Sequence, residues 1–308
     1  MSHLTNVIPA IVFHIQYDAG FSNDDKIFHI DCYELKFKLQ ARRFDQISGD
    51  NSFILFIGEP NNDKEQSYEI ASKFDKCLRI ASLNFSLGII TKNINPTSRS
   101  VITDHGLKFI EQISGNTCRA MNLSDGINIL PVDGQLCFPN IMMSHKSLVD
   151  VKIFFGELID IYNKKLIIDD LHNTIIDMLN SSFYEKSPWA RFIICVSAIE
   201  LMSPRDEEDD ATYKFFKDIE EYAVSKYPQI KEKINNKFID IYKKSISASC
   251  RETISKYLGE DRAKEFSKIY SVRSKIAHGT FHTQTGHPDT RIVFELAKDL
   301  LMAKILPS

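Results

Sequence analysis

The segment YSVRSKIAHG, residues 270 to 279, places an arginine and a histidine at the end of a lysine-rich helical pattern. Arginine keeps its positive charge in proteins, so Arg273 is suited to stabilise negative charge on a phosphate or a carboxylate. Histidine gains and loses a proton near neutral pH, so His278 is suited to acid-base catalysis. Together the two side chains could hold an anion and transfer protons on it.

Arg273 is unusual because it falls among apolar residues. On an ideal helix, which turns by about 100° per residue, it lies near the centre of the face formed by Phe266, Ile269 and Ile276. Lys275 points away from that face. A guanidinium at such a position needs a carboxylate, a subunit interface or an anionic ligand.

A second charged residue among apolar ones is a carboxylate in WARFIICVSAIELM, residues 189 to 202. This segment is apolar around most of its circumference. Glu200 sits within this segment, where a lone charge is costly. A direct interpretation is that Glu200 and Arg273 neutralise each other inside a helical bundle. This ion pair is compatible with a catalytic role of Arg273 and also with a structural one.

His278 stands about 140° from Arg273 on an ideal helix and about 7.5 Å further along its axis, so the two side chains do not converge if the helix stays regular. Gly279 favours a helix end at this point, which would let His278 depart from the regular spacing. Contact with the last carbonyls of the helix is the simpler role for His278. His282 and His287 follow without an evident carboxylate or cysteine set, so we expect neither a metal nor another cofactor.

The elements that must position these residues change along the chain. The first third predicts strands at 7–15, 26–39 and 52–58, a helix at 64–83, and short strands near 85–91 and 127–138. The rest predicts an all-helical part. Its expected helices are 147–164, 166–182, 188–202, 211–225, 229–244, 246–258, 261–278 and 289–306. The sequence therefore predicts an α+β protein with a β-rich mixed domain at 1–145 and an all-α domain at 146–308.

Composition narrows the class of protein. The 308 residues are 43% hydrophobic with a net charge of −3, which fits a globular chain without a global basic field. The segment 226–275 holds thirteen Lys or Arg and six Asp or Glu, either as solvated helix faces or as a surface that attracts phosphates. Six scattered cysteines, no signal segment and no membrane-length apolar run lead us to expect a cytoplasmic protein with reduced thiols.

The segments AIELM, SISASCRETISKYLGE and AKEFSKIYSVRSKIAHG together resemble the HEPN superfamily, in particular its Apea-like branch. The resemblance is strongest over about 186 to 306. Its most specific part is an R-x4-H signature formed by Arg273 and His278, preceded by Tyr270.

The resemblance implies an up-and-down helical bundle that dimerises and a metal-independent endoribonuclease of defence or toxin systems. Arg273 and His278 would then be the catalytic pair, with Glu200, Tyr270, Ser274 and Lys275 as supporting residues. RNA would be the substrate, and a regulatory or antitoxin protein would be a further partner. Because some HEPN members bind RNA, nucleotides or proteins without cutting, the alternative is a non-catalytic module in which Arg273 pairs structurally with Glu200.

Overall fold

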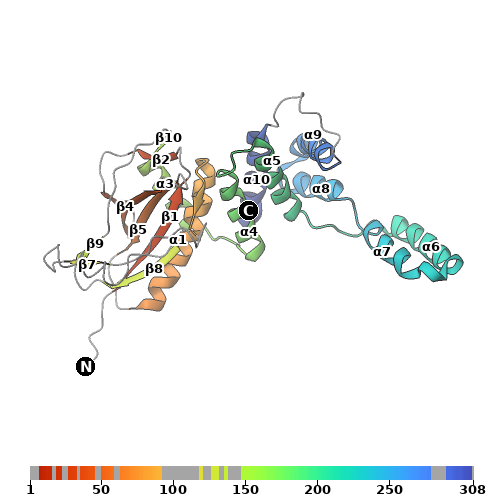
Figure 1. The fold of residues 1–308 in the computed structure, drawn as a ribbon, viewed down its shortest axis with the longest axis horizontal. Coiled ribbons are helices and arrows are strands. Elements are labelled where there is room, and N and C mark those ends of the chain that lie inside the picture. The colour runs from red at the N-terminus through yellow and green to blue at the C-terminus, as the bar shows by residue number, and fades with distance from the viewer. Residues whose placement is uncertain are drawn as a thin grey trace. The chain divides into compact units, whose positions relative to one another are not determined.

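The computed structural model divides into two compact units, Met1–Lys186 and Ser187–Ser308. Strands gather in the first unit and helices make up the second, as Figure 1 shows, so the predicted order of β-rich and helical parts is confirmed. The residues that the structure describes are 7–15, 19–22, 27–32, 35–45, 50–58, 63–91, 118–120, 126–131, 135–137, 147–278 and 289–306.

The first unit is built on an antiparallel sheet in the order β3-β4-β5-β1-β6, with β8 also paired to β1. Two parallel pairs, β10 with β2 and β7 with β9, lie outside this sheet. The strands are β1 (Val7–Ile15), β2 (Ala19–Ser22), β3 (Ile27–Cys32), β4 (Leu35–Asp45), β5 (Asp50–Ile57), β6 (Ile89–Ile90), β7 (Cys118–Ala120), β8 (Gly126–Pro131), β9 (Gln135–Cys137) and β10 (Ser147–Asp150).

Several sequence predictions in this unit were wrong in detail. The strand expected near 85–91 is confined to β6, the one near 127–138 is divided into β8 and β9, and the helix expected at 166–182 begins at Asp170. The expected strand 26–39 is a hairpin, because Cys32 pairs with Leu35 and the chain reverses between them. No glycine or proline marks that reversal, so the strand-forming residues on its two sides predict a single strand. The expected helix 147–164 begins only at Val151, because residues 147 to 150 form β10.

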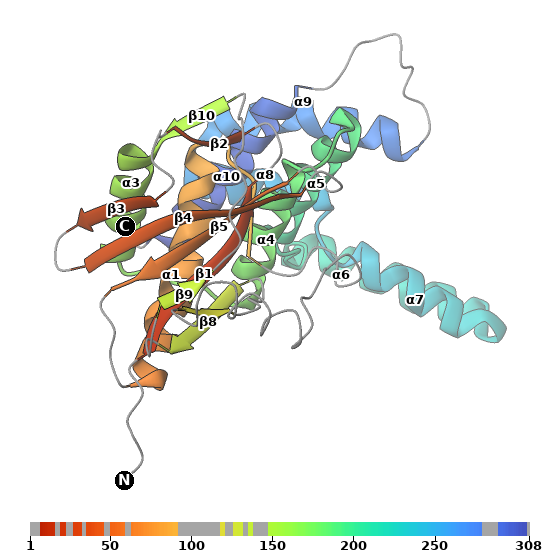
Figure 2. The same cartoon turned by 60° about the vertical axis from the view of Figure 1, so that its left-hand side comes forward.

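Helix α1 (Lys64–Asn84) packs against the sheet, as Figure 2 shows, and confirms the predicted helix at 64–83. Asp63 begins it by accepting hydrogen bonds from the backbone N–H groups of Glu65 and Gln66, both at 3.0 Å. Phe74 and Leu78, three to four residues apart, are fully buried on its inner face.

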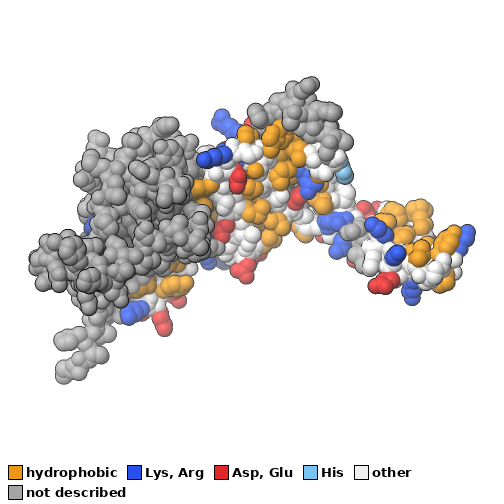
Figure 3. Space-filling model, in the orientation of Figure 1, with side chains coloured by type: hydrophobic (Ala, Val, Ile, Leu, Met, Phe, Trp, Pro, Cys, Tyr) orange, Lys and Arg blue, Asp and Glu red, His pale blue; other side chains and the backbone are white. Residues whose placement is uncertain are grey.

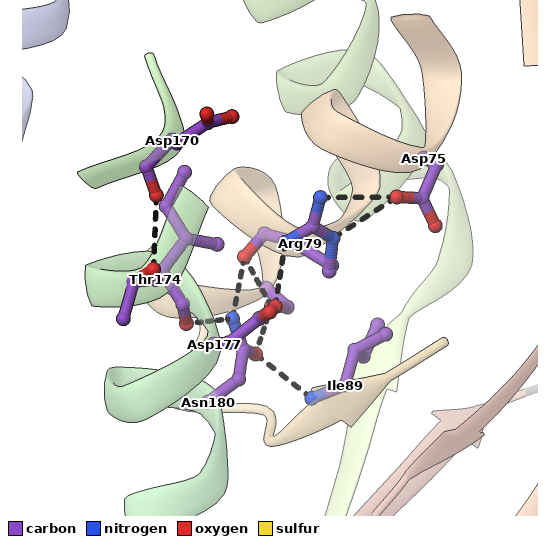
Figure 4. Close-up of polar contacts among 9 residues, drawn as sticks. Asp75, Arg79, Ile89, Asp170, Thr174, Asp177 and Asn180 are labelled. Atoms are coloured by element: carbon purple, nitrogen blue, oxygen red, sulfur yellow. Dashed lines mark hydrogen bonds and ion pairs between the residues drawn. The ribbon is translucent and has the colours of Figure 1, made fainter. Parts of the chain in front are cut away.

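Helices α3 (Val151–Asn163) and α4 (Asp170–Ser182) also belong to the first unit, because both pack on α1. A buried polar network, shown in Figure 4, ties α4 to α1. Arg79 Nη1 lies 2.6 Å from Asp177 Oδ1, and its Nε lies 3.1 Å from Asp75 Oδ2. The Asn180 amide donates to the Arg79 carbonyl and accepts from the Ile89 N–H.

These contacts explain where the chain divides. The boundary between the two units falls between Lys186 and Ser187, whereas the sequence predicted a domain boundary between residues 145 and 146. The sequence changes from strand to helix patterns near residue 146, but the first two helices after that change, α3 and α4, pack on α1 of the first unit. The second unit corresponds closely to the 186–306 region of the HEPN resemblance.

Four helices of the second unit form a bundle in which each contacts the other three. They are α5 (Pro188–Leu201), α8 (Ile246–Leu258), α9 (Glu260–Ala277) and α10 (Thr290–Ile305). Between α5 and α8 the chain forms a helical hairpin of α6 (Asp210–Lys226), the short 3-10 turn η1 (Pro228–Ile230) and α7 (Lys231–Ile241). The hairpin extends away from the bundle in both ribbon views (Figures 1 and 2).

Candidate functional site

Helices α5 and α9 carry the two charged residues that the sequence singled out. Ser187 caps α5 by accepting from the Ala190 N–H, and Pro188 occupies the first turn, where its missing N–H costs nothing. Gly259 links α8 to α9 with a φ of 91°, a left-handed value that glycine adopts without a Cβ clash. This turn places α9 against α8 within the bundle.

Arg273 and Glu200 form the ion pair that the sequence suggested. Arg273 Nε lies 3.1 Å from Glu200 Oε1, and Arg273 Nη2 donates to Oε2 at 3.4 Å. The Arg273 guanidinium carbon also lies 5.7 Å from the centre of the Tyr270 ring. The hypothesis of a Glu200–Arg273 pair is confirmed in its geometry, which joins α5 to α9.

The pair is only partly enclosed. The Glu200 side chain is 17% exposed, whereas the Arg273 side chain keeps 30% of its surface accessible. Ile269 and Ile276 on the same face of α9 are half-buried, while Phe266 nearer its beginning is fully buried. The apolar face of α9 is therefore buried in its first half and only partly buried in its second half, around Arg273.

Two protic side chains lie beside this pair. Burial raises the pKa of the Cys250 thiol to about 11; the Ser203 hydroxyl and the Arg273 charge oppose that rise, and the Glu200 charge adds to it. Burial also raises the pKa of Tyr270, again with a contribution from Glu200 against Arg273. Both groups are therefore protonated at neutral pH, so Cys250 is not poised as a nucleophile.

His278 lies at the other end of the motif. It follows the last residue of α9 with φ −91° and ψ 4°, its N–H still donates to the Ser274 carbonyl at 3.0 Å, and its side chain is exposed. Up to this residue the chain keeps close to the helical path, so the expected departure from regular spacing does not begin before His278. A helix continued to this point leaves Arg273 and His278 on different sides of its axis.

The remaining predicted residues surround the end of α9. Ser274 is half-buried and Lys275 is exposed. Gly279, His282 and His287 lie outside the described residues. Among the described side chains, no three His, Cys, Asp or Glu residues gather as metal ligands.

Cys250 and Ser203 were missed by the sequence analysis. Ser203 lies just past α5, where its N–H donates to the Glu200 carbonyl at 3.1 Å. The place of Cys250 depends on how α8 packs against α5 and α9, which no spacing within one helix reveals. The only sequence signal was the run of small residues around Cys250 in SISASC, which favours close helix packing without naming a partner.

Within the described parts of the chain, no helix has the length and apolar character needed to cross a bilayer. No family model matches this chain, and no curated protein or solved structure matches it either. The HEPN resemblance thus rests on the residues of its motif, and the activity that it implies is a proposal.

Proposed function

We propose that this chain is a metal-independent HEPN-type endoribonuclease whose catalytic residues are Arg273 and His278. The observation that carries the proposal is the incomplete enclosure of Arg273, which pairs with Glu200 and still keeps 30% of its side chain exposed. A guanidinium carries five N–H donors, and one carboxylate does not use them all. His278, exposed at the end of the same helix, supplies a proton-transfer group.

In the proposed reaction the 2′-hydroxyl of RNA attacks the neighbouring phosphorus. The 2′-oxygen gives up its proton, the bond from phosphorus to the 5′-oxygen breaks, and that oxygen gains a proton. His278 acts in this proton transfer, and Arg273 stabilises the charge that develops on the phosphate oxygens. The products are a 2′,3′-cyclic phosphate end and a 5′-hydroxyl end.

A homodimer would bring Arg273 and His278 of two protomers together. Arg273 and His278 of one protomer lie about 140° apart on a regular helix, so one protomer alone does not direct both at one phosphate. The half-buried Ile269 and Ile276 around Arg273 favour a two-fold contact on this face, which would place both motifs in one cleft. A cytoplasmic defence or toxin role, held in check by a regulatory or antitoxin protein, is part of the same proposal.

A non-catalytic HEPN module is the second candidate, and the Glu200–Arg273 contact itself favours it. If the arginine serves only to neutralise Glu200, its loss lowers stability and the loss of His278 changes nothing. RNA or nucleotide binding, or assembly with a protein, would then be the function of the bundle.

Cleavage assays on folded variants test the proposal. The purified chain should cut single-stranded or structured RNA in the presence of EDTA, and Arg273→Ala and His278→Ala should each reduce cleavage by at least about 100-fold. Arg262→Ala is a matched control, because Arg262 lies on the same helix, is 31% exposed and pairs with Glu265 and Asp299. Equal loss in all three variants, or full activity of His278→Ala, contradicts the proposal.

A further inference from the structure

Tyr270 lies on α9 between a buried aromatic ring and the Arg273 guanidinium. Its ring centre is 5.5 Å from that of Phe266, which is fully buried four residues earlier on the same helix. Three residues later, the guanidinium carbon of Arg273 lies over the Tyr270 ring, 5.7 Å from its centre. Residues three or four apart share one face of a helix. The three side chains therefore form a row along α9 that leads from the buried part of the bundle to the candidate site.

Tyr270 also interacts with the carboxylate that pairs with Arg273. Burial is the main cause that raises the pKa of Tyr270, and the charge of Glu200 and a hydrogen bond to Glu200 raise it further. The phenol is therefore protonated at neutral pH and able to donate to the carboxylate. Tyr270 thus contacts both members of the ion pair, Arg273 through its ring and Glu200 through its hydroxyl.

The ring and the carboxylate hold the guanidinium of Arg273 in different ways. A carboxylate accepts hydrogen bonds from guanidinium N–H groups, so a second carboxylate would take up more of the five donors. The face of an aromatic ring attracts the positive charge without accepting those in-plane N–H bonds. An arginine that has to bind a phosphate is therefore better held by a ring than by another carboxylate.

A cation beside an aromatic ring is not unusual on the second unit, where hydrophobic side chains lie at the surface among those of lysine or arginine (Figure 3). Lys256 Nζ and Lys304 Nζ lie 5.4 Å and 4.9 Å from the ring centre of Tyr257, which is 39% exposed. Tyr270 differs because it is half-buried, packs on the buried Phe266 ring and also contacts the acidic partner of its cation. These contacts fix the place of its ring, as a positioning residue requires.

We propose that Tyr270 is a positioning residue, which holds the Arg273 guanidinium in the orientation in which it meets the scissile phosphate. The inference rests on the proposed function, and it gives Tyr270 a task that the HEPN resemblance does not specify. An arginine side chain has many rotamers, and a contact that restricts them before the substrate binds reduces the entropy lost on binding. Tyr270 does not touch the substrate in this arrangement, so its effect passes through Arg273.

Cleavage kinetics of two variants separate the ring from the hydroxyl. Tyr270→Leu keeps an apolar side chain on Phe266 and removes the ring, so kcat should fall by about tenfold while KM changes by less than about twofold. Tyr270→Phe keeps the ring and should retain kcat to within about threefold of the parent. Tyr257→Leu is the matched control, because it removes another ring beside cations, and it should leave kcat unchanged. If Tyr270→Leu does not fold, Tyr270→Met removes the ring with a more adaptable side chain.

Chemical labelling of arginines tests the inference apart from cleavage. Phenylglyoxal reacts with guanidinium groups, and peptide mapping by mass spectrometry gives a rate for each arginine. In Tyr270→Leu the rate at Arg273 should rise by about threefold or more, because the guanidinium is no longer held on the ring. Arg262 of the same helix, whose side chain is 31% exposed, should keep its rate.

Two results overturn the inference for a chain that cuts RNA. One is a fall in kcat, or no fall, with an unchanged labelling rate at Arg273. The other is a tenfold rise in KM at unchanged kcat, because the tyrosine would then bind RNA itself. A parent chain that cuts no RNA ends the nuclease proposal separately; faster labelling of Arg273 in Tyr270→Leu then still supports the holding role of Tyr270, and unchanged labelling overturns it.

Discussion

Arg79 of the first unit and Arg273 of the second each join two helices through carboxylates, but they differ in what remains available. The Arg79 side chain is 5% exposed and bonds to two carboxylates, those of Asp75 and Asp177. The Arg273 side chain is 30% exposed, and among the described residues Glu200 is the one carboxylate that it bonds to. Arg79 is therefore enclosed between two carboxylates of the first unit, whereas Arg273 has one described carboxylate partner and keeps part of its surface exposed.

The difference shows that an arginine on an apolar helix face is not by itself a sign of a site. Both arginines break the apolar pattern of their helices, and both have an acidic partner. The two arginines differ in the exposed fraction of their side chains and in the number of their described carboxylate partners. These two properties depend on the packing of several helices.

The largest effect is expected for Arg79→Ala. This variant leaves Asp75 and Asp177 without their common partner inside the first unit, so we expect the free energy of unfolding to fall by about 3–5 kcal/mol. Urea denaturation measures it, with Arg251→Ala as the control because Arg251 is exposed on α8. A fall of less than about 1 kcal/mol would show that Arg79 is not the structural counterpart of Arg273.

A smaller stability effect is expected for Arg273→Met. Because Arg273 is partly exposed, we expect a loss of about 1–3 kcal/mol, below the value for a sealed pair. Adding Glu200→Leu should recover most of that stability, because no carboxylate is then stranded. RNA cleavage should stay lost in the double variant. If restoring stability also restores cleavage, the arginine acts only through the fold.

Two buried thiols, Cys77 on the same helix as Arg79 and Cys250 beside Arg273, give the smallest effect. Burial raises the pKa of Cys77 to about 12 and of Cys250 to about 11, from an ordinary value of 9.0. Unfolded thiols ionise first, so this contribution to stability is complete below pH 9 and is lost as the pH rises toward 11 and 12.

Two measurements check the thiols. The urea midpoint should fall between pH 9 and pH 10, and Cys250 should react with iodoacetamide at lower pH than Cys77 when peptides are mapped by mass spectrometry. Fast native labelling of Cys77 at neutral pH would contradict the sealed character of the first region.

The helices could be predicted from the sequence with good accuracy because their apolar spacing and caps are local. The predicted helix 188–202 corresponds to α5, and 246–258 corresponds to α8. The β3–β4 hairpin could not be predicted, because its turn carries no glycine or proline. The division of the chain also could not, because it depends on the Arg79 network between helices that are far apart in sequence.

The candidate site, too, could be predicted from the sequence only in part. The Glu200–Arg273 pair could be proposed because each residue breaks an apolar pattern, and their contact is confirmed. The neighbouring Cys250 and Ser203 break no pattern. Ser203 follows Glu200 at the end of α5, and the packing of α8 brings Cys250 to the pair.

The most direct test of the central claim compares an RNA oligonucleotide with the same sequence carrying a 2′-deoxy nucleotide at the cut position. We predict that the purified chain cuts the first oligonucleotide in EDTA, leaves a 2′,3′-cyclic phosphate and does not cut the second. Both His278→Ala and Arg273→Met should leave the RNA uncut. Cleavage of the 2′-deoxy substrate, or undiminished cleavage by the Arg273→Met variant, would contradict the account.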